Sequence, residues 1–198
     1  MLSKGKNLTL AVTPIITGSI SFVASFTIIF SILRSNVKLS NSYRRLVFGI
    51  SVYGLLLSIS QTSSSVPMPV DTYSLASGND TTCAIQTFVG SLGFSGTIFY
   101  SLSLTIYFLL VVKYDVCDTK ITKHVEPFLH AIPIIYSSVF PICVLATKNY
   151  NVDVQTASCM IGSRPLNCYD DPEVDCISKG DPIILPLILG SSMIAIFT

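Results

Sequence analysis

The side chains best suited to covalent chemistry in this sequence are its cysteines. Cys159, Cys168 and Cys176 lie within one acidic stretch, and Cys83 opens a long uncharged segment. Grouped thiols form disulfides in an oxidising compartment or bind zinc, often together with histidine. Because no histidine lies near these four in the sequence, we expect two disulfides and no metal site. Four cysteines allow three pairings, and all three stay open from spacing alone.

Patterns typical of enzymes are missing from the sequence. It has no Gly-rich phosphate loop, no GxSxG and no pair of carboxylates inside an apolar block. Proton or ion carriers normally hold an ionisable group within the membrane, and His130 is the one histidine inside such a block. We expect His130 to be a hydrogen-bonded interface residue. We therefore predict that the protein is not an enzyme and needs no cofactor.

The elements that position these residues follow from the distribution of charge. Only 12% of the 198 residues are charged, and the mean hydropathy is +0.65. All 23 charged residues fall in short windows, which leave uncharged blocks at 8–33, 46–70, 81–112, 127–147 and 182–198. Because a charge at the bilayer centre costs about 3 kcal/mol and about 20 apolar residues cross the hydrocarbon, these blocks predict membrane spans. The net charge of +1 gives no indication of nucleic-acid binding.

The predicted fold is an all-α integral membrane protein, embedded in the lipid bilayer. It has four full transmembrane helices and a partial fifth, within which the chain stops. The expected ranges are about 10–33, 45–64, 84–112, 127–147 and 183–198, with a long loop at 148–181.

Loop charges predict the orientation of these helices. Loop 34–45 holds four basic residues and no acid, whereas loop 148–181 holds six acidic and three basic residues. Basic short loops face the cytosol, so we expect the N-terminus outside and the loop 148–181 outside. Cys83 and the glycosylation sequon at Asn79 lie on the same outer side, which agrees with disulfide formation there.

Small and polar residues recur along the blocks at helical spacing. Most are expected to let helices approach one another, because lipid gives no hydrophobic drive for association. Near the outer ends we predict a polar ligand pocket instead, formed by Gln61, Thr62, Ser65 and Gln86.

The stretch CAIQTFVGSLGFSGTIFYSLSLTIYFLLVVKYD, from Cys83 to Asp115, resembles helix three of a seven-transmembrane G-protein-coupled receptor of the cyclic-AMP-receptor-like and secretin-like branch of unicellular eukaryotes. Helices one, two and four show the same likeness in three stretches, ITGSISFVASFTIIFSILRS, KLSNSYRRLVFGISVYGLLLSIS and VEPFLH. The resemblance implies a Cys83–Cys159 disulfide and a second bridge between Cys168 and Cys176. Pairing of Cys83 with Cys168 or Cys176 stays an alternative.

The resemblance also implies a function. An extracellular ligand would bind at the outer helix ends of a seven-helix-receptor-type bundle in the plasma membrane. A cytosolic partner, a heterotrimeric G protein, would meet a face formed by Arg44, Arg45, Lys113, Tyr114 and Asp115. A simpler role for Arg44 and Arg45 is to anchor their helix at anionic headgroups. The chain lacks Asp-Arg-Tyr after helix three and has no tryptophan, unlike the rhodopsin-like branch.

Two other functions fit the same pattern of spans. The first is a membrane scaffold or adaptor with a disulfide-bonded outer loop, which the absence of Cys-Cys-Gly in that loop disfavours. The second is part of a transporter, which the uncharged spans and the lack of a detectable repeat disfavour.

Overall fold

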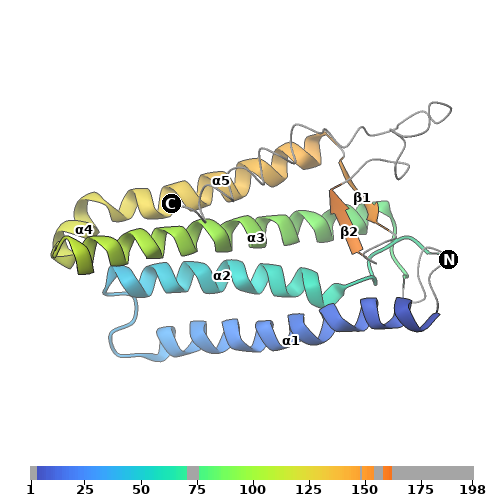
Figure 1. Ribbon diagram of the computed structural model, residues 1–198, viewed down its shortest axis with the longest axis horizontal. Helices are drawn as coiled ribbons and strands as arrows, with labels where there is room; N and C mark the ends of the chain where they lie inside the picture. The colour runs from blue at the N-terminus through green and yellow to red at the C-terminus, as the bar shows by residue number, and fades with distance from the viewer. Residues whose placement is uncertain (1–3, 71–75, 148, 154–157, 162–198) are drawn as a thin grey trace.

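Four long helices form the molecule in a computed structural model that describes residues 4–70, 76–147, 149–153 and 158–161. They are α1 (Lys4–Arg34), α2 (Ser42–Ser63), α3 (Asp80–Phe108) and α5 (Glu126–Ala146). Successive long helices run in opposite directions (Figure 1), and α3 lies between α2 and α5 while α1 packs on α2. We call the end where α3 begins the disulfide end, and the end where α2 and α5 begin the Arg45 end.

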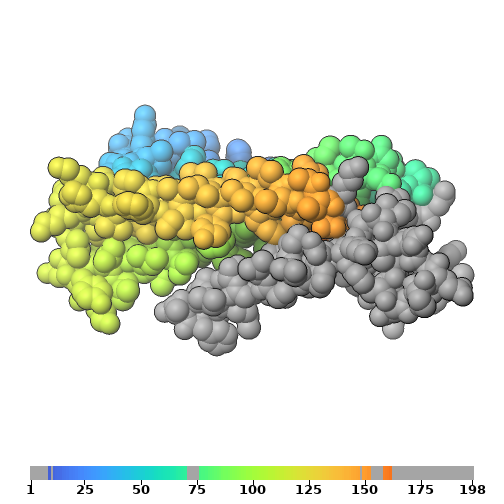
Figure 2. Space-filling model, turned by 90° about the horizontal axis from the view of Figure 1, so that it is seen from above, coloured from blue at the N-terminus to red at the C-terminus, as the bar shows by residue number. Residues whose placement is uncertain are grey.

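The distribution of apolar side chains is the reverse of that in a soluble bundle. Large apolar residues face outward, including Ile20 at 66% and Phe128 at 65% exposure. The buried positions between helices hold small hydroxyl residues such as Ser58, Ser103 and Ser137. All four long helices are long and apolar enough to cross a membrane. In Figure 2 one such surface, that of α5, runs along the bundle in yellow to orange. These features indicate an integral membrane protein.

Close approach of α2 and α3 depends on glycine. A Cβ atom at Gly93 would lie 2.8 Å from the Cα of Leu57 on α2, and one at Gly96 would collide with the ring of Tyr53. Between α1 and α2, Gly18 lies against the hydroxyl of Thr62 in the same way. The expectation that small residues serve helix packing is confirmed at these positions.

The predicted helix bounds were accurate to one residue at α5, whereas the other three long helices begin earlier than predicted. α1 begins six residues before the predicted start, α2 three and α3 four. The earlier start of α3 follows from a capping box, in which the Asn79 side chain accepts from the Thr82 N–H at 2.9 Å and the Thr82 hydroxyl accepts from the Asn79 N–H at 2.8 Å. These bonds satisfy N–H groups that the helix itself leaves unpaired. Asn79 is exposed, and its glycosylation stays a prediction.

The sequence analysis predicted neither the short helix α4 (Asp118–His124) nor two strands, and it did not distinguish a π-helical turn at the end of the predicted helix 84–112. α3 continues as this π-helical turn, η1 (Leu109–Lys113), and α4 crosses the Arg45 end. In the predicted loop 148–181, β1 (Tyr150–Asp153) and β2 (Ser158–Ile161) form an antiparallel hairpin in which Val152 lies opposite Cys159. The all-α description therefore holds for the bundle and omits this hairpin. The predicted fifth helix, 183–198, lies outside the described residues.

Substitution of Gly93 by alanine is expected to force α2 and α3 apart, because the new methyl group meets backbone atoms that cannot rotate away. We expect a loss of roughly 1–3 kcal/mol in the free energy of unfolding, measured by circular dichroism in detergent micelles. Gly54→Ala is the matched control, since its methyl would meet only the Ser25 hydroxyl, at 3.0 Å. Equal stability of the two variants would contradict this account of the interface.

Candidate functional site

A disulfide fixes the hairpin to the first turn of α3. Cys83 and Cys159 are bonded, with their Cα atoms 5.5 Å apart and a sequence separation of 76. Both are buried, together with Met68. This is the pairing that the receptor resemblance implied, and it replaces the alternatives that link Cys83 to Cys168 or Cys176. Those two cysteines lie outside the described residues.

Gln86 of α3 provides hydrogen bonds to carbonyl groups at the C-terminal end of α2. Its Nε2 donates to the carbonyl oxygens of Ser60 at 2.9 Å and Ser64 at 2.7 Å, and the Ser60 hydroxyl donates to the Gln86 carbonyl at 3.0 Å. The Ser64 hydroxyl donates to the Ala11 carbonyl of α1 at 2.8 Å. The last carbonyls of a helix lack partners within it, so these contacts join α1, α2 and α3 where lipid offers no replacement.

Three of the four predicted pocket residues hold a buried polar atom with no hydrogen-bond partner. Across the described part of the chain these atoms are Thr62 Oγ1, Ser65 Oγ and Gln86 Oε1, besides His130 Nε2 at the other end. The fourth residue, Gln61, is exposed. A buried polar atom is normally paired with protein or water. Thr62 Oγ1 faces Gly18 of α1, whereas Gln86 approaches α2 from α3, and each of these atoms can bond a water molecule or another polar group.

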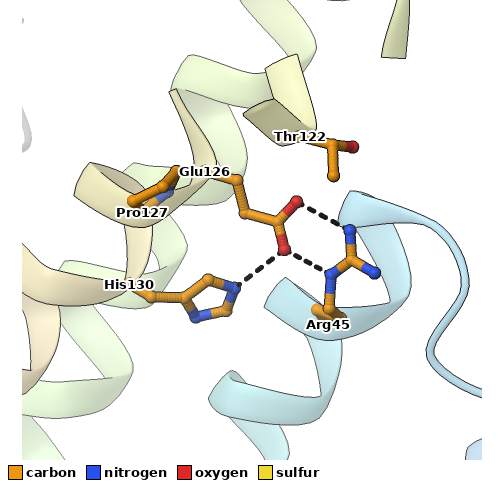
Figure 3. A pocket seen from close by; sticks show the side chains of 5 residues that line it. All are labelled: Arg45, Thr122, Glu126, Pro127 and His130. Atoms are coloured by element: carbon orange, nitrogen blue, oxygen red, sulfur yellow. Dashed lines mark hydrogen bonds and ion pairs between the residues drawn. The ribbon is translucent and has the colours of Figure 1, made fainter. Parts of the chain in front are cut away.

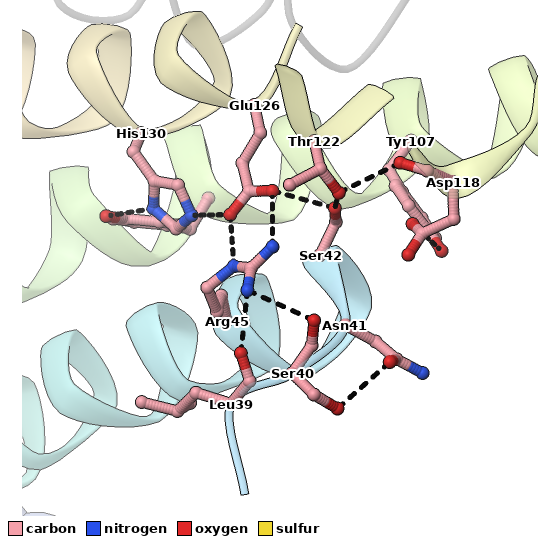
Figure 4. Close-up of polar contacts among 11 residues, drawn as sticks. Leu39, Ser40, Asn41, Ser42, Arg45, Tyr107, Asp118, Thr122, Glu126 and His130 are labelled. Carbon is pink, nitrogen blue, oxygen red and sulfur yellow. Dashed lines mark hydrogen bonds and ion pairs between the residues drawn. The ribbon is translucent and has the colours of Figure 1, made fainter. Parts of the chain in front are cut away.

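At the Arg45 end, one carboxylate joins α2 to α5. Arg45 donates from Nε and Nη2 to the two oxygens of Glu126, the second at 2.7 Å, and the Ser42 hydroxyl donates to Oε2 at 2.7 Å (Figure 4). Nη1 of Arg45 donates to the Leu39 and Ser40 carbonyls at 2.7 and 3.2 Å. Only 9% of the Glu126 side chain is exposed. The pair is thus largely desolvated, and hydrogen bonds occupy both carboxylate oxygens.

A histidine and two tyrosines extend this contact to α3 and α4. Nε2 of His130 lies 3.6 Å from Oε1 of Glu126, and Nδ1 lies 3.1 Å from the Tyr100 hydroxyl. The Tyr107 hydroxyl donates to Asp118 at 3.2 Å, while Ser42 and Thr122 share a bond of 2.8 Å. We call Arg45, Glu126, His130 and Tyr100 the Glu126 network. His130 is hydrogen-bonded at a helix interface, which confirms the expectation for it.

A shallow open pocket of about 270 Å³ lies over this network. Its lining combines both ionic partners with neighbouring side chains, namely Arg45, Thr122, Glu126, Pro127 and His130 (Figure 3). The Glu126 carboxylate lies between the guanidinium and the imidazole. Because its oxygens already accept bonds from Arg45 and Ser42, this carboxylate is better suited to linking helices than to holding a metal ion.

The five predicted coupling residues all lie at the Arg45 end, and their common role in coupling stays a prediction. The Arg45 guanidinium is bonded to Glu126 between α2 and α5 with 27% of its side chain exposed, and its headgroup-anchoring role stays a prediction. Arg44 is partly exposed and donates to the Ser35 hydroxyl at 2.7 Å. Lys113, Tyr114 and Asp115 are exposed, with the Lys113 ammonium 5.6 Å from the Tyr114 ring centroid. Sequence reasoning missed Glu126, whose only signal is its place before Pro127 at a helix start.

No family model matches the chain, and no curated protein shows significant similarity to it. The class of the protein therefore rests on its own features: four apolar helices long enough to cross a membrane, a polar interior, and a disulfide at one end. Together they indicate a helical membrane protein with two polar clusters at opposite ends of α3.

Replacing Arg45 with alanine is expected to leave Glu126 as an unpaired, largely buried charge. We expect a loss of about 3 kcal/mol, toward the lower end for buried pairs because 27% of the Arg45 side chain is exposed. The measurement is thermal unfolding in micelles. Arg44→Ala removes the same charge one residue away and should cost under about 1 kcal/mol.

A double variant separates pairing from packing at this site. Arg45→Met combined with Glu126→Leu removes both charges, so we expect stability close to that of the unsubstituted protein. If the double variant were as unstable as Arg45→Ala, the loss would come from packing and not from the uncompensated carboxylate.

Proposed function

We propose that the protein is a transmembrane signalling receptor of the G-protein-coupled type. Its ligand binds at the disulfide end, and its cytosolic partner binds at the Arg45 end. The main observation that supports this proposal is that one helix, α3, contributes residues to both polar clusters. Cys83 and Gln86 lie in its first turns, and Tyr100 and Tyr107 lie toward its other end.

The contacts at the two ends of α3 differ in kind. At the disulfide end α3 is joined to the hairpin by a covalent bond and to α2 by Gln86. At the Arg45 end its polar links to α5 and α4 are single hydrogen bonds, Tyr100 to His130 and Tyr107 to Asp118, beside the apolar packing of the two tyrosines. A ligand that favours one position of α3 is expected to change the weaker contacts first. Such a bias between two arrangements is what a receptor requires.

The unpartnered atoms define the chemistry of the ligand. Gln86 Oε1 only accepts hydrogen bonds, whereas the Thr62 and Ser65 hydroxyls both donate and accept. A small polar ligand with an N–H or O–H group therefore complements the cluster. An entirely apolar ligand would leave all three atoms unpaired at a cost of about 1–3 kcal/mol each.

The receptor proposal is tested by the rate of nucleotide exchange on purified heterotrimeric G proteins, with the full-length protein in vesicles. Because the Glu126 network joins α2, α3 and α5, we expect Glu126→Gln to raise basal exchange severalfold on one subtype. Thr27→Ala, which removes an exposed hydroxyl bonded to the Val23 carbonyl of its own helix α1, should match the unsubstituted protein.

Two results would decide against the receptor. The scaffold alternative would be favoured if nucleotide exchange stayed, for every G-protein subtype and for both variants, at the rate measured with vesicles that lack the protein. If Thr27→Ala and Glu126→Gln altered exchange equally, the Glu126 network would be excluded from the mechanism.

Labelling of Cys117 tests the proposed orientation. This exposed thiol accepts a hydrogen bond from the Thr119 hydroxyl at 3.4 Å, and that bond lowers the pKa of Cys117 below its ordinary value. A lower pKa means more thiolate at neutral pH, so maleimide labelling should remain fast as the pH falls toward 7. Thr119→Val should raise the pKa and slow labelling at pH 7.

The same reagent reports which side of the membrane holds Cys117. A membrane-impermeant maleimide should label intact cells weakly at this position and label permeabilised cells strongly. Cys117→Ser provides the background from the other thiols. Strong Cys117-dependent labelling of intact cells would place the Arg45 end outside and reverse the proposed orientation.

A further inference from the structure

Positive charge is concentrated at the Arg45 end. Every lysine and arginine whose side chain the structure describes lies there: Arg34, Lys38, Arg44, Arg45, Lys113, Lys120 and Lys123. Of these, Arg45 is neutralised by Glu126. Among the described residues, the other six have no carboxylate within ion-pair distance. Asp115 and Asp118 offset part of this charge, and the described surface there keeps a net positive charge.

Two of these cations, Lys120 and Lys123, lie on the exposed side of helix α4. Ile121 is completely buried against the core that includes Leu46 and Leu129. Asp118 accepts from Tyr107, and Thr122 is bonded to Ser42, so both ends of α4 are attached to the bundle. With Ile121 facing inward, the exposed Lys120 and Lys123 face away from the core. Their position is fixed by the fold.

Large apolar and aromatic residues accompany these cations. Exposed side chains in the adjoining segments are Val37, Tyr43, Val112, Tyr114 and Phe128. Aromatic rings beside lysine and arginine are typical of the membrane–water interface. Lys120 also lies only seven residues beyond Lys113, where the candidate span of α3 and η1 ends. These groups therefore lie at the depth of lipid phosphates, which favours a lipid over a protein as their partner.

We infer that the Arg45 end is a binding surface for anionic phospholipid headgroups, with Lys120 and Lys123 of α4 as its fixed contacts. Each cation near an anionic leaflet favours binding by about fivefold, and salt screens the attraction. The surface goes beyond the receptor proposal and does not depend on it, because it requires only that the helices cross the membrane.

The test uses the full-length protein in vesicles of phosphatidylcholine with one tenth phosphatidylglycerol. After mild extraction, mass spectrometry measures the ratio of the two lipids retained on the protein. We expect phosphatidylglycerol to be enriched about fivefold over the vesicle ratio, with a fall toward that ratio in 0.5 M salt.

Two double variants isolate the charge of α4. Lys120→Gln with Lys123→Gln should lose most of the enrichment, whereas Lys120→Arg with Lys123→Arg should keep it. Circular dichroism checks that both remain helical. The inference would be overturned if the unsubstituted protein retained the two lipids at their vesicle ratio. It would also be overturned if both double variants showed equal enrichment of phosphatidylglycerol. The first result would leave an acidic protein as the better partner for these cations.

Discussion

The bundle is shaped by the fact that lipid offers neither hydrogen-bond partners nor a hydrophobic reason for helices to associate. Polar groups must therefore be satisfied between helices, and backbones must approach closely. The contacts that hold α2 against its neighbours follow this constraint. Ser58 donates to the hydroxyl of Ser21 on α1 at 2.9 Å, and Ser137 on α5 donates to the Tyr53 hydroxyl at 3.0 Å. Many large apolar residues lie on the outside, and a smaller apolar core around Leu46, Ile121 and Leu129 remains between the helices.

The same constraint explains why the polar clusters lie at the ends of the helices. Carbonyl groups at the end of α2 need donors, and Gln86 supplies two. Ionisable groups are costly at the membrane centre, so Arg45 and Glu126 lie in the first turns of α2 and α5. Between the clusters α3 carries small residues and hydroxyls that bond to its own carbonyls, such as Ser95 to Ser91 at 2.7 Å. The hydroxyls in this part of α3 are therefore satisfied within the helix, while its glycines allow close packing against α2.

The sequence predicted the spans well because charge is excluded from lipid in any fold, so the blocks without charge are visible in one chain alone. It predicted three residues that hold unpartnered buried atoms, since polar residues at a helix end stand out against an apolar block. The Arg45–Glu126 pair was not predicted, because its partners are 81 residues apart and each sits among other charges. The hairpin was missed because its strands are only four residues long and are attached to α3 by the Cys83–Cys159 disulfide. The strand propensity of a short segment does not reveal such a constraint. The exposure of Gln61 depends on the rotation of α2, which spacing does not fix.

Arg44 and Arg45 are adjacent and chemically identical, yet the fold gives them different roles. A cation in the first turn of a helix is opposed by the helix dipole, whereas a carboxylate there is favoured. Glu126 at the start of α5 therefore lies in a favourable field and Arg45 at the start of α2 in an unfavourable one. The Leu39 and Ser40 carbonyls, together with the carboxylate, offset that field for Arg45. Because these acceptors come from both the preceding loop and α5, the guanidinium fixes where α2 begins relative to α5. Arg44 has the Ser35 hydroxyl as its partner, and its charge stays available at the surface.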